Sequence, residues 1–383
     1  MRRDALIVGG GPAGCAAAIT LARAGCHPTL IERSNGPTDK VCGDFLSVDS
    51  IQHARFLGVD PIELGAVPIS RVRLIHRDRV AESELPFMAV GLSRRVLDEA
   101  LLDQARHAGA IVHTGKEVRR LTRDGSKSIV VLADGNALSA GTVFLATGKH
   151  DIRAHARAWS GPRAVGLKMY FDPRNELARI LEGATELTLF PGGYAGMQSV
   201  EGGRVVLCIA VHQKAFKQYG GTWAHLTRAI GQFSPRFAEI LSGSRPLLPN
   251  PLAIAGVPYG YRSPPLSLFC LGDQAAVIPS LTGDGMAIAL HSGLSAARAW
   301  IAHQDAPAYQ RTLGQALAPQ MRLAGWLHRA GVNPGFQPAV VPLMRLFPSL
   351  TRLAAARTRL PGRLSLLPDP TRPSGISSPH WGQ

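Results

Sequence analysis

The first 33 residues of the chain carry the pattern that most restricts its fold. The apolar run Ala5–Val8 is short and aliphatic, as in a buried parallel strand. Glycines follow at positions 9, 11 and 14, in the spacing G-x-G-x-x-G, and an alanine-rich segment continues to Gly25. A second apolar run, Pro28–Ile31, comes next. This order predicts strand, turn, helix and strand, the start of a dinucleotide-binding α/β unit.

Each residue type in the turn suits the binding of a pyrophosphate. Gly9 permits the tight turn out of the strand, Gly11 lets the backbone approach the phosphates, and Gly14 lets the helix pack closely on the strands. Pro12 and Ala13 begin the helix, where free N–H groups and the positive end of the helix dipole favour an anion. We therefore expect these five residues to bind the dinucleotide.

Glu32 and Arg33 follow the second predicted strand. An acidic residue at this point accepts hydrogen bonds from a ribose diol and favours a free 2′-hydroxyl over a 2′-phosphate. A glycine-rich turn without a ligand is the alternative interpretation. A signal peptide is excluded because Asp4, four glycines and Pro12 interrupt the apolar core that it needs.

The composition narrows the class of protein. No apolar run approaches the roughly 18 to 20 residues of a membrane-spanning helix. The five cysteines are scattered without a C-x-x-C pair, which argues against a disulfide framework and a zinc site and favours a reducing cytoplasm. The formal net charge of +15 suits an acidic partner, anionic lipid or a phosphorylated substrate, or simply a solvated basic surface. No nucleic-acid motif accompanies this charge.

Changes of pattern along the chain predict two α/β domains. Alternating strand-like runs lie at 66–90 and, between glycine turns, at 156–265, which suggests an antiparallel sheet that binds the substrate. The strand and helix patterns of the dinucleotide domain occupy the stretches between them. We assign residues 1–65, 91–155 and 266–302 to the cofactor domain, and 66–90 with 156–265 to the substrate domain.

The chain after residue 302 has a different composition. Amphipathic helical pieces fill 303–371, and ten arginines lie between Arg298 and Arg372 against two aspartates. We expect this region to make a salt-sensitive contact with an acidic partner protein or an anionic membrane. The protein would then be cytoplasmic or peripheral to the inner membrane. Residues 372–383 are rich in Ser, Pro and Gly and are predicted to be disordered.

Three later segments are placed to meet the cofactor. Cys42, Gly43 and Asp44 lie in the loop after the second strand. Cys42 is either at the reactive edge of the cofactor or a small buried hydrophobe, and Asp44 either bonds the substrate or caps the loop. The other candidates lie at two strand ends and in a second glycine loop that opens a helix: Gly148, Asp273, Pro279, Gly283, Asp284, Gly285 and Met286. The amides of that loop would point at an anion.

Four of these features together resemble one family of flavoproteins. They are the N-terminal fingerprint, Cys42-Gly43, Ser93-Arg94 with Asp98, and the run from Gly272-Asp273 to Gly285. The resemblance is to the para-hydroxybenzoate hydroxylase fold, which includes aromatic hydroxylases, geranylgeranyl reductases and flavin-dependent halogenases. It covers residues 1 to about 302.

The resemblance implies an α/β fold and a cofactor. The fold has a Rossmann-like FAD-binding domain of the glutathione-reductase type, an inserted antiparallel-sheet substrate domain and a helical C-terminal region. The cofactor is FAD, with Arg94 and the Val118 backbone along it and Asp273 on its ribityl chain. The loop from Pro279 to Gly285 faces the flavin ring, where a helix N-terminus stabilises the negative charge of reduced flavin.

The sequence departs from each branch of the family. Gly148–Arg153 replaces the D-G-x-x-S-x-x-R stretch of many NADPH-using hydroxylases, so electrons come either from NAD(P)H or from a separate flavin reductase. The chain has no Trp-x-Trp pair, which speaks against the halogenases. Phe190-Pro191 lacks the preceding aromatic signature of geranylgeranyl reductases, whereas Cys42-Gly43 is closer to those reductases than to the hydroxylases.

The favoured activity is that of an FAD-dependent monooxygenase, which hydroxylates an electron-rich aromatic substrate through a flavin C4a-hydroperoxide in a dry pocket. One alternative is reduction of a C=C bond in a prenyl or other lipid substrate. The other is a maturation flavoprotein that modifies an aromatic side chain of an acidic partner protein or a carrier-bound substrate. The substrate is therefore hydrophobic or aromatic, and Cys42 and Asp44 are the candidate catalytic residues.

Overall fold

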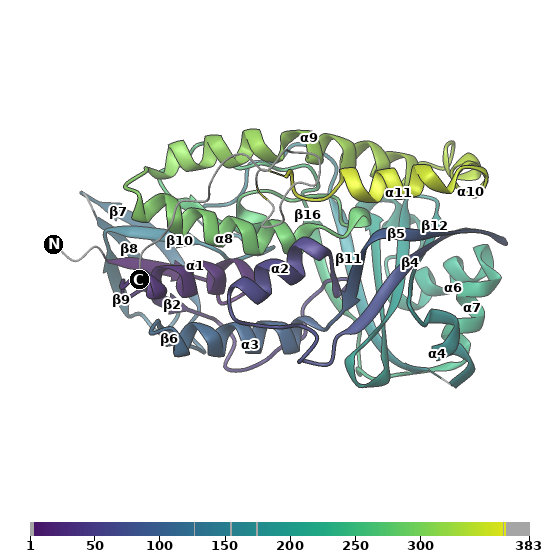
Figure 1. The fold of residues 1–383 in the computed structure, drawn as a ribbon, viewed down its shortest axis with the longest axis horizontal. Helices are drawn as coiled ribbons and strands as arrows, with labels where there is room; N and C mark the ends of the chain where they lie inside the picture. Colours follow the sequence, from purple (N-terminus) through teal and green to yellow (C-terminus); the bar gives the residue numbers. More distant parts are fainter. Residues whose placement is uncertain (1–3, 126, 154, 174, 363, 365–383) are drawn as a thin grey trace, which may run out of the picture.

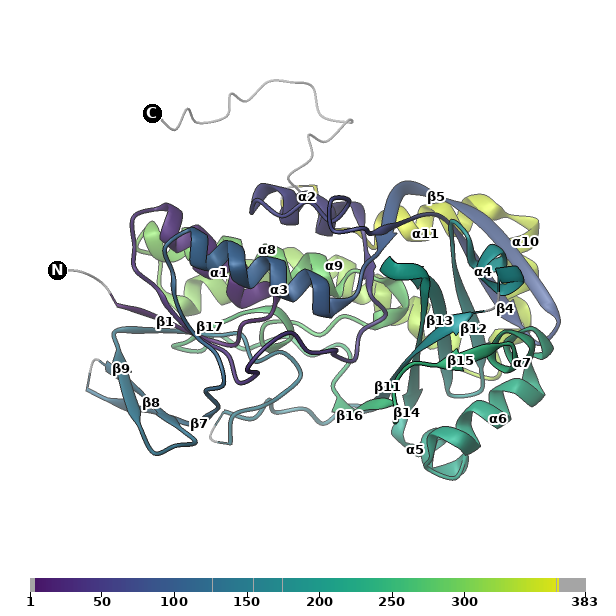
Figure 2. The same cartoon turned by 90° about the horizontal axis from the view of Figure 1, so that it is seen from below.

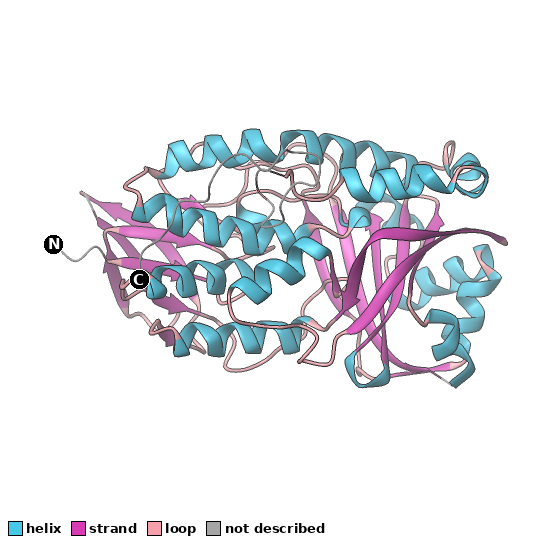
Figure 3. Ribbon diagram, in the orientation of Figure 1, coloured by secondary structure: helices cyan, strands magenta, loops and turns pink. Residues whose placement is uncertain are grey.

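The protein has two lobes that lie side by side along its long axis (Figure 1). The computed structural model describes residues 4–125, 127–153, 155–173, 175–362 and 364. One lobe is built on a parallel sheet and the other on a larger mixed sheet, with helices over both (Figure 3). The mixed α/β class predicted from the sequence is confirmed. The predicted disordered segment 372–383 lies outside the described residues.

The first lobe is the predicted cofactor domain. Its parallel sheet has the order β17 (Phe269–Cys270), β10 (Thr142–Leu145), β1 (Ala5–Val8), β2 (Thr29–Ile31) and β6 (Ile111–His113). Helices α1 (Pro12–Arg23), α3 (Arg94–His107) and α8 (Gly285–Ile301) cover one face (Figure 2). An antiparallel sheet of β7 (Val118–Asp124), β8 (Lys127–Leu132) and β9 (Ala137–Ala140) lies on the other side. The strand–turn–helix–strand prediction is therefore confirmed.

Helices α1 and α8 pack closely because small residues face each other where they meet. A Cβ at Gly293 of α8 would lie 2.0 Å from the carbonyl oxygen of Ala13. Ala16, Ala17 and Ala18 of α1 are fully buried. No large side chain therefore separates the two helices. Residues at the start of each helix line one cavity.

The second lobe holds a nine-stranded sheet. Its order is β15 (Ser244–Pro246), β11 (Ala164–Pro173), β14 (Arg204–His212), β13 (Gly193–Val200), β12 (Ala184–Phe190), β4 (Val67–His76), β5 (Arg79–Gly91) and β3 (Phe45–Leu46), and β16 (Leu252–Val257) also pairs with β11. The expectation of an antiparallel sheet is corrected at one place, since β12 and β4 pair in parallel. The chain forms the hairpin β4–β5 in this sheet, leaves for the first lobe and later re-enters the sheet. On re-entry, β12 runs beside β4 in the same direction. The stretch 1–65 also contributes β3 to this sheet.

Helices cover both faces of the mixed sheet. On one face lie α4 (Asn175–Leu181), α5 (Gln213–Gln218), α6 (Trp223–Phe233) and α7 (Pro235–Ser242). The other face carries the end of α9 (Ala306–Val332) together with α10 (Gln337–Leu346) and α11 (Pro348–Arg357) (Figure 2). The remaining elements are α2 (Val48–Phe56) and three short 3₁₀ turns, Glu201–Gly203, Gly272–Gln274 and Ser280–Thr282.

The C-terminal helices join the two lobes. Helix α9 runs along the top of the molecule from the first lobe to the second (Figure 1), with its apolar side against β17, β12 and β13. In the part of the chain that the structure describes, no single helix has the length and apolar character needed to cross a membrane.

Candidate functional site

The glycine turn after β1 has the geometry of a phosphate-binding loop. Gly9 adopts a φ of +111°, and a Cβ at Gly14 would lie 1.9 Å from the Gly9 carbonyl oxygen, so packing alone requires both glycines. At Gly11, the nearest atom to a Cβ is 3.5 Å away, on Arg94. Gly11 also caps α1 without a side-chain hydrogen bond. The turn therefore leaves room for a ligand beside free amides at the helix N-terminus.

A cleft of about 370 Å³ extends from this turn past the carboxyl ends of the parallel strands. Ligands of open α/β sheets bind at this edge. The cleft brings together eight of the residues that the sequence assigned to the cofactor: Gly9, Gly11, Glu32, Arg33, Arg94, Val118, Gly148 and Asp273. It is also lined by Lys40, Lys116 and Lys149, which were not predicted. Their positive charge suits a phosphate-bearing ligand.

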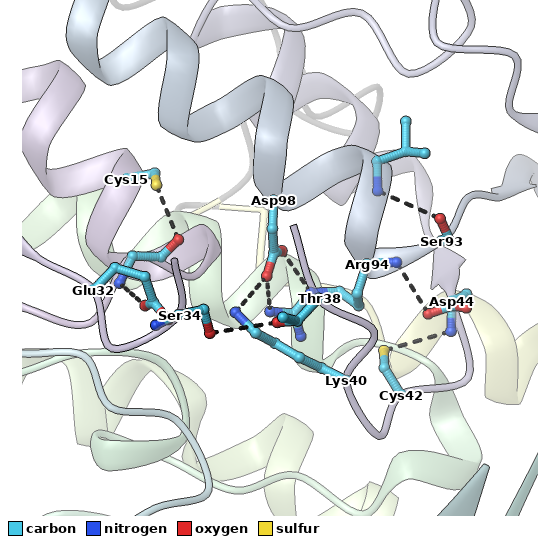
Figure 4. A network of polar contacts seen from close by, with 12 residues as sticks. Cys15, Glu32, Ser34, Thr38, Lys40, Cys42, Asp44, Ser93, Arg94 and Asp98 are labelled. Carbon is cyan, nitrogen blue, oxygen red and sulfur yellow. Dashed lines mark hydrogen bonds and ion pairs between the residues drawn. The ribbon is translucent and has the colours of Figure 1, made fainter. Parts of the chain in front are cut away.

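Glu32 is held in place by the backbone around it (Figure 4). Its carboxylate accepts hydrogen bonds from the N–H of Gly10 at 2.7 Å and of Ser34 at 3.0 Å. Burial alone would raise the pKa of Glu32, but the Lys40 ammonium and these two hydrogen bonds bring it below its ordinary value. Glu32 is therefore an ionised acceptor at the end of the cleft.

The start of α3 places a buried arginine against the cleft. The Ser93 hydroxyl caps the helix by accepting the N–H of Val96. Arg94 then donates two hydrogen bonds to Asp98, at 2.7 and 2.8 Å, and Lys40 reaches the same carboxylate at 2.9 Å. Burial would raise the pKa of Asp98, but these two cations hold it below its ordinary value. Two cations share one carboxylate, so a positive charge remains beside the cleft.

Asp44 lies in a closed polar cluster. Its carboxylate is fully buried and accepts hydrogen bonds from Lys168 at 2.7 and 2.9 Å and from the Tyr170 hydroxyl at 2.6 Å, both on β11. The sequence suggested that Asp44 could hydrogen-bond the substrate. The structure corrects this expectation, because Lys168 and Tyr170 already occupy the carboxylate. The cluster instead fixes the loop that carries Cys42 and Gly43, and Figure 4 shows the Asp44 N–H directed at the Cys42 sulfur.

A second cavity, of about 190 Å³, continues from the cleft. Predicted residues from the starts of α1 and α8 and from the Cys42 loop form its wall: Gly11, Pro12, Ala13, Cys42, Gly43, Gly283, Gly285 and Met286. Cys42 is half-buried, and its sulfur accepts the N–H of Asp44 at 3.4 Å. Cys208 of β14 lines the same cavity, and burial raises the pKa of its thiol to about 12. Two thiols therefore face one space.

The loop before α8 presents its backbone to this cavity. Gly283 has a φ of +69°, and a Cβ there would lie 2.7 Å from the Phe45 ring. Pro279 and Asp284, both assigned to the cofactor from the sequence, do not line the cavity. Their assignment as direct contacts is therefore not supported by the geometry, whereas Gly283, Gly285 and Met286 lie where they were expected.

Asp284 points into the protein behind the loop. It is fully buried and accepts hydrogen bonds from Ser47 and Arg359, each at 2.9 Å, and from the Gln320 amide. Burial raises its pKa to about 6, although Arg359 opposes this change. Its role is to anchor the loop from behind, and its partners Gln320 and Arg359 come from the C-terminal region.

An apolar pocket of about 330 Å³ begins where the second cavity ends. The two spaces share five residues: Gly43, Phe45, Cys208, Ser280 and Gly283. From there the pocket runs between the mixed sheet and helices α9–α11, past apolar side chains such as Leu74, Phe87, Leu187, Leu327, Val340 and Met344. The helix residues were not predicted because 303–371 was expected to be a separate region. Their amphipathic spacing, as at Val340 and Met344, was the signal that pointed to them.

Polar groups in the apolar pocket are sparse and placed at defined points. The hydroxyls of Tyr194 and Tyr259 both hydrogen-bond Ser280 at the junction with the second cavity. Burial raises the pKa of Tyr259 to about 12, so its hydroxyl is neutral. Within the described residues, the buried Nε2 of Gln198 has no hydrogen-bond partner, and this side chain lines the pocket. Gln198 is therefore a polar side chain of the pocket wall with an unsatisfied amide donor.

The cleft and the second cavity fit FAD. Glu32 and the open amides at Gly11 suit a ribose and a pyrophosphate, and the second cavity reaches the N-terminus of α8. Residues 2–143 match the family model described as an FAD binding domain. The chain is therefore a flavoprotein with the fold of the para-hydroxybenzoate hydroxylase type. It is an FAD-dependent oxidoreductase, as the sequence predicted.

Relatives of this flavoprotein include reductases. It is 26% identical to a menaquinone reductase of Mycolicibacterium smegmatis, over 77% of this chain and 76% of the relative. It is 29% identical to digeranylgeranylglycerophospholipid reductase 2 of Methanopyrus kandleri, over 76% and 75% of the two chains. The flavin-dependent brominase Bmp2 has the same fold, with a TM-score of 0.77 at 17% identity over 93% of this chain and 94% of that one.

Proposed function

We propose that this flavoprotein reduces a C=C bond in a prenyl lipid. The observation that carries the proposal is the apolar pocket, which begins at the cofactor-facing loop and continues between the sheet and α9–α11. A long apolar chain fills such a space and gains the free energy of leaving water. The names of two relatives support this choice, since they state reduction of menaquinone and of digeranylgeranylglycerophospholipid.

The residues of the chain divide the work of such a reaction. Reduced FAD, when bound, supplies a hydride to one carbon of the double bond. The other carbon then needs a proton, and Cys42 is the proposed donor because its thiol lies in the second cavity, beside the residues shared with the pocket. The Asp44 N–H and the Lys168 cluster position this thiol. The apolar walls exclude water from the reacting atoms.

Gln198 is the proposed group that orients the substrate. Its buried Nε2 is without a partner among the described residues and would otherwise remain unsatisfied, at a cost of about 1 to 3 kcal/mol. An oxygen atom of the lipid, as in a quinone, an ether or an alcohol, supplies the missing acceptor. We expect Gln198→Leu to raise the KM for an oxygen-bearing lipid and to leave FAD content unchanged.

An anaerobic single-turnover experiment tests the reaction. Enzyme with reduced FAD is mixed with a prenyl lipid, and flavin reoxidation is followed together with product mass. We expect reoxidation without oxygen and a product heavier by two hydrogens. Cys42→Ser should slow this step at least about 100-fold, while the matched variant Cys208→Ser keeps most of the rate. Reoxidation that requires oxygen would contradict the proposal.

Aromatic hydroxylation is the second candidate function. The hydroxyl groups of Tyr194, Tyr259 and Ser280 lie at the junction of the two spaces and suit the hydrogen bonding of a phenol. In that case, product formed under labelled oxygen would carry one labelled atom, and Cys42→Ser would leave turnover largely intact. The same two variants therefore separate the candidates.

A further inference from the structure

The two last described helices meet at an elbow with an unusually apolar surface. This elbow comprises α10 and α11, which are bent by 105° relative to each other (Figure 1). Large apolar side chains stand exposed on it, with Leu346 at 74%, Phe347 at 53% and Leu353 at 51% exposed. Leu343 and Leu350 are exposed beside them. Five such neighbours in eleven residues form a patch, which on soluble proteins marks an interaction site.

The helices that carry this patch also carry positive charge and no acidic residue of their own. Arg345, Arg352 and Arg357 are exposed on the elbow, and none of them has an ion pair with another described residue. Residues 306–362 contain seven arginines and no aspartate or glutamate. Arginine side chains beside leucine and phenylalanine suit the boundary between lipid headgroups and acyl chains, where the guanidinium meets phosphate.

Neither helix of the elbow is long enough to span a bilayer by itself. Each helix has ten residues, which is about 15 Å of helix against a hydrocarbon thickness of about 30 Å. The opposite side of the elbow packs against the rest of the protein, because Val341 is fully buried and Val340 and Met344 line the apolar pocket. The elbow can therefore lie along a bilayer surface but cannot enter it end-on.

We infer that the outer face of the elbow docks this flavoprotein on the surface of an anionic lipid bilayer. Leu346, Phe347 and Leu350 insert among the acyl chains, and the three arginines contact lipid phosphates. The apolar side chains and the absence of acidic residues favour lipid over an acidic protein, which would need matched polar groups. Docking itself does not depend on the reaction that the enzyme catalyses.

A groove beside the elbow leads from the docking surface toward the apolar pocket. About 840 Å³ of space lies between α9 and α11, lined by Leu323 and by the exposed Leu350 and Leu353. The groove and the apolar pocket have four residues in common: Leu327, Met344, Ala354 and Arg359. A lipid tail can thus pass from the bilayer to the pocket along apolar side chains. This route, unlike the docking, rests on the proposed function.

Vesicle sedimentation with the FAD-loaded protein tests the docking. We expect binding to phosphatidylglycerol-containing vesicles that weakens with salt, and much weaker binding to pure phosphatidylcholine. The triple variant Arg345→Gln, Arg352→Gln and Arg357→Gln should lose roughly 100-fold in affinity at low salt. The variant Leu346→Ser, Phe347→Ser and Leu350→Ser should lose at least about tenfold. Flavin absorbance reports that each variant is folded.

Matched controls come from the far end of the molecule. Ile111 on β6 is also exposed, at 52%, and Arg119 and Arg120 are exposed on β7. We expect Ile111→Ser and the pair Arg119→Gln, Arg120→Gln to bind vesicles as the wild type does. Equal loss in elbow and control variants, or unchanged binding in the elbow variants, would overturn the docking. Activity on a short, water-soluble prenyl substrate should survive the pair Leu346→Ser, Phe347→Ser, because these residues line neither the groove nor the pocket. Loss of that activity would count against the proposed reaction instead.

Discussion

The cofactor cleft and the apolar pocket are joined by the second cavity, which meets the pocket at Gly43 and Gly283, yet cleft and pocket select their ligands by different means. The cleft uses particular residues at particular points, such as Glu32, Arg94 and the amides beside Gly11. The pocket uses shape and apolar surface, to which any aliphatic side chain can contribute. Chemistry with strict residue requirements leaves a pattern in the sequence, whereas a shape assembled from distant helices and strands does not.

The largest expected effect separates packing from binding within the cleft. Gly14→Val should prevent folding of the first lobe, because its Cβ would meet the Gly9 carbonyl oxygen. Gly11→Val should fold with a free energy of unfolding within about 1 kcal/mol of the wild-type apoprotein, since its Cβ meets only the end of the Arg94 side chain, at 3.5 Å. Its affinity for FAD should fall at least about 100-fold. Circular dichroism and flavin content measure the two effects.

Removal of Lys168 tests the support beneath the junction. Lys168→Met leaves the fully buried Asp44 carboxylate without its cation, which should lower the free energy of unfolding by about 3 to 5 kcal/mol. Denaturant unfolding of the apoprotein gives the value. The double variant Lys168→Met, Asp44→Asn should recover much of the loss, and a double variant as unstable as the single one would show that the ion pair is not the cause.

A pH dependence is expected from the first lobe. Burial, then the neighbouring His53 and Arg298, lower the pKa of His291 to about 3, so the folded protein keeps it neutral while the unfolded chain protonates it near 6.5. The contribution of the neutral His291 to the free energy of unfolding is fully present above pH 6.5. It decreases as the pH falls and is smaller by about 2 kcal/mol at pH 5. His291→Leu should reduce the loss between pH 8 and pH 5. If the variant loses as much stability between pH 8 and pH 5 as the wild type does, His291 is not the cause of the pH dependence.

The smallest effect should be confined to the pocket. Ala355 lines the apolar pocket and its neighbour Ala356 is exposed. Ala355→Phe should raise the KM for a prenyl lipid roughly tenfold by filling the space, with FAD content unchanged, and Ala356→Phe is the matched control. If Ala355→Phe also releases FAD, the pocket and the cleft are not the separate sites that the comparison assumes.

The sequence predicted the first lobe well because its constraints are local. The strand Ala5–Val8 and the three glycines are each visible within a few residues and lie as expected. Single side-chain directions were not predictable. Asp284 lies in a glycine loop that faces the cofactor, yet its side chain points into the protein. There it accepts hydrogen bonds from Ser47, Gln320 and Arg359. These partners are remote in sequence, and local patterns carry no information about them.

The ion pair between Arg359 and Asp284 also sets an order of events during synthesis. The arginine lies 75 residues after the aspartate that it neutralises, so the ribosome makes Asp284 and its loop well before their cation. An unpaired carboxylate is costly to bury, so Asp284 stays in water or takes up a proton in the incomplete chain. The ionised form of Asp284 therefore meets its cation only after α11 has been made, and the last part of the chain completes the anchor of the cofactor-facing loop.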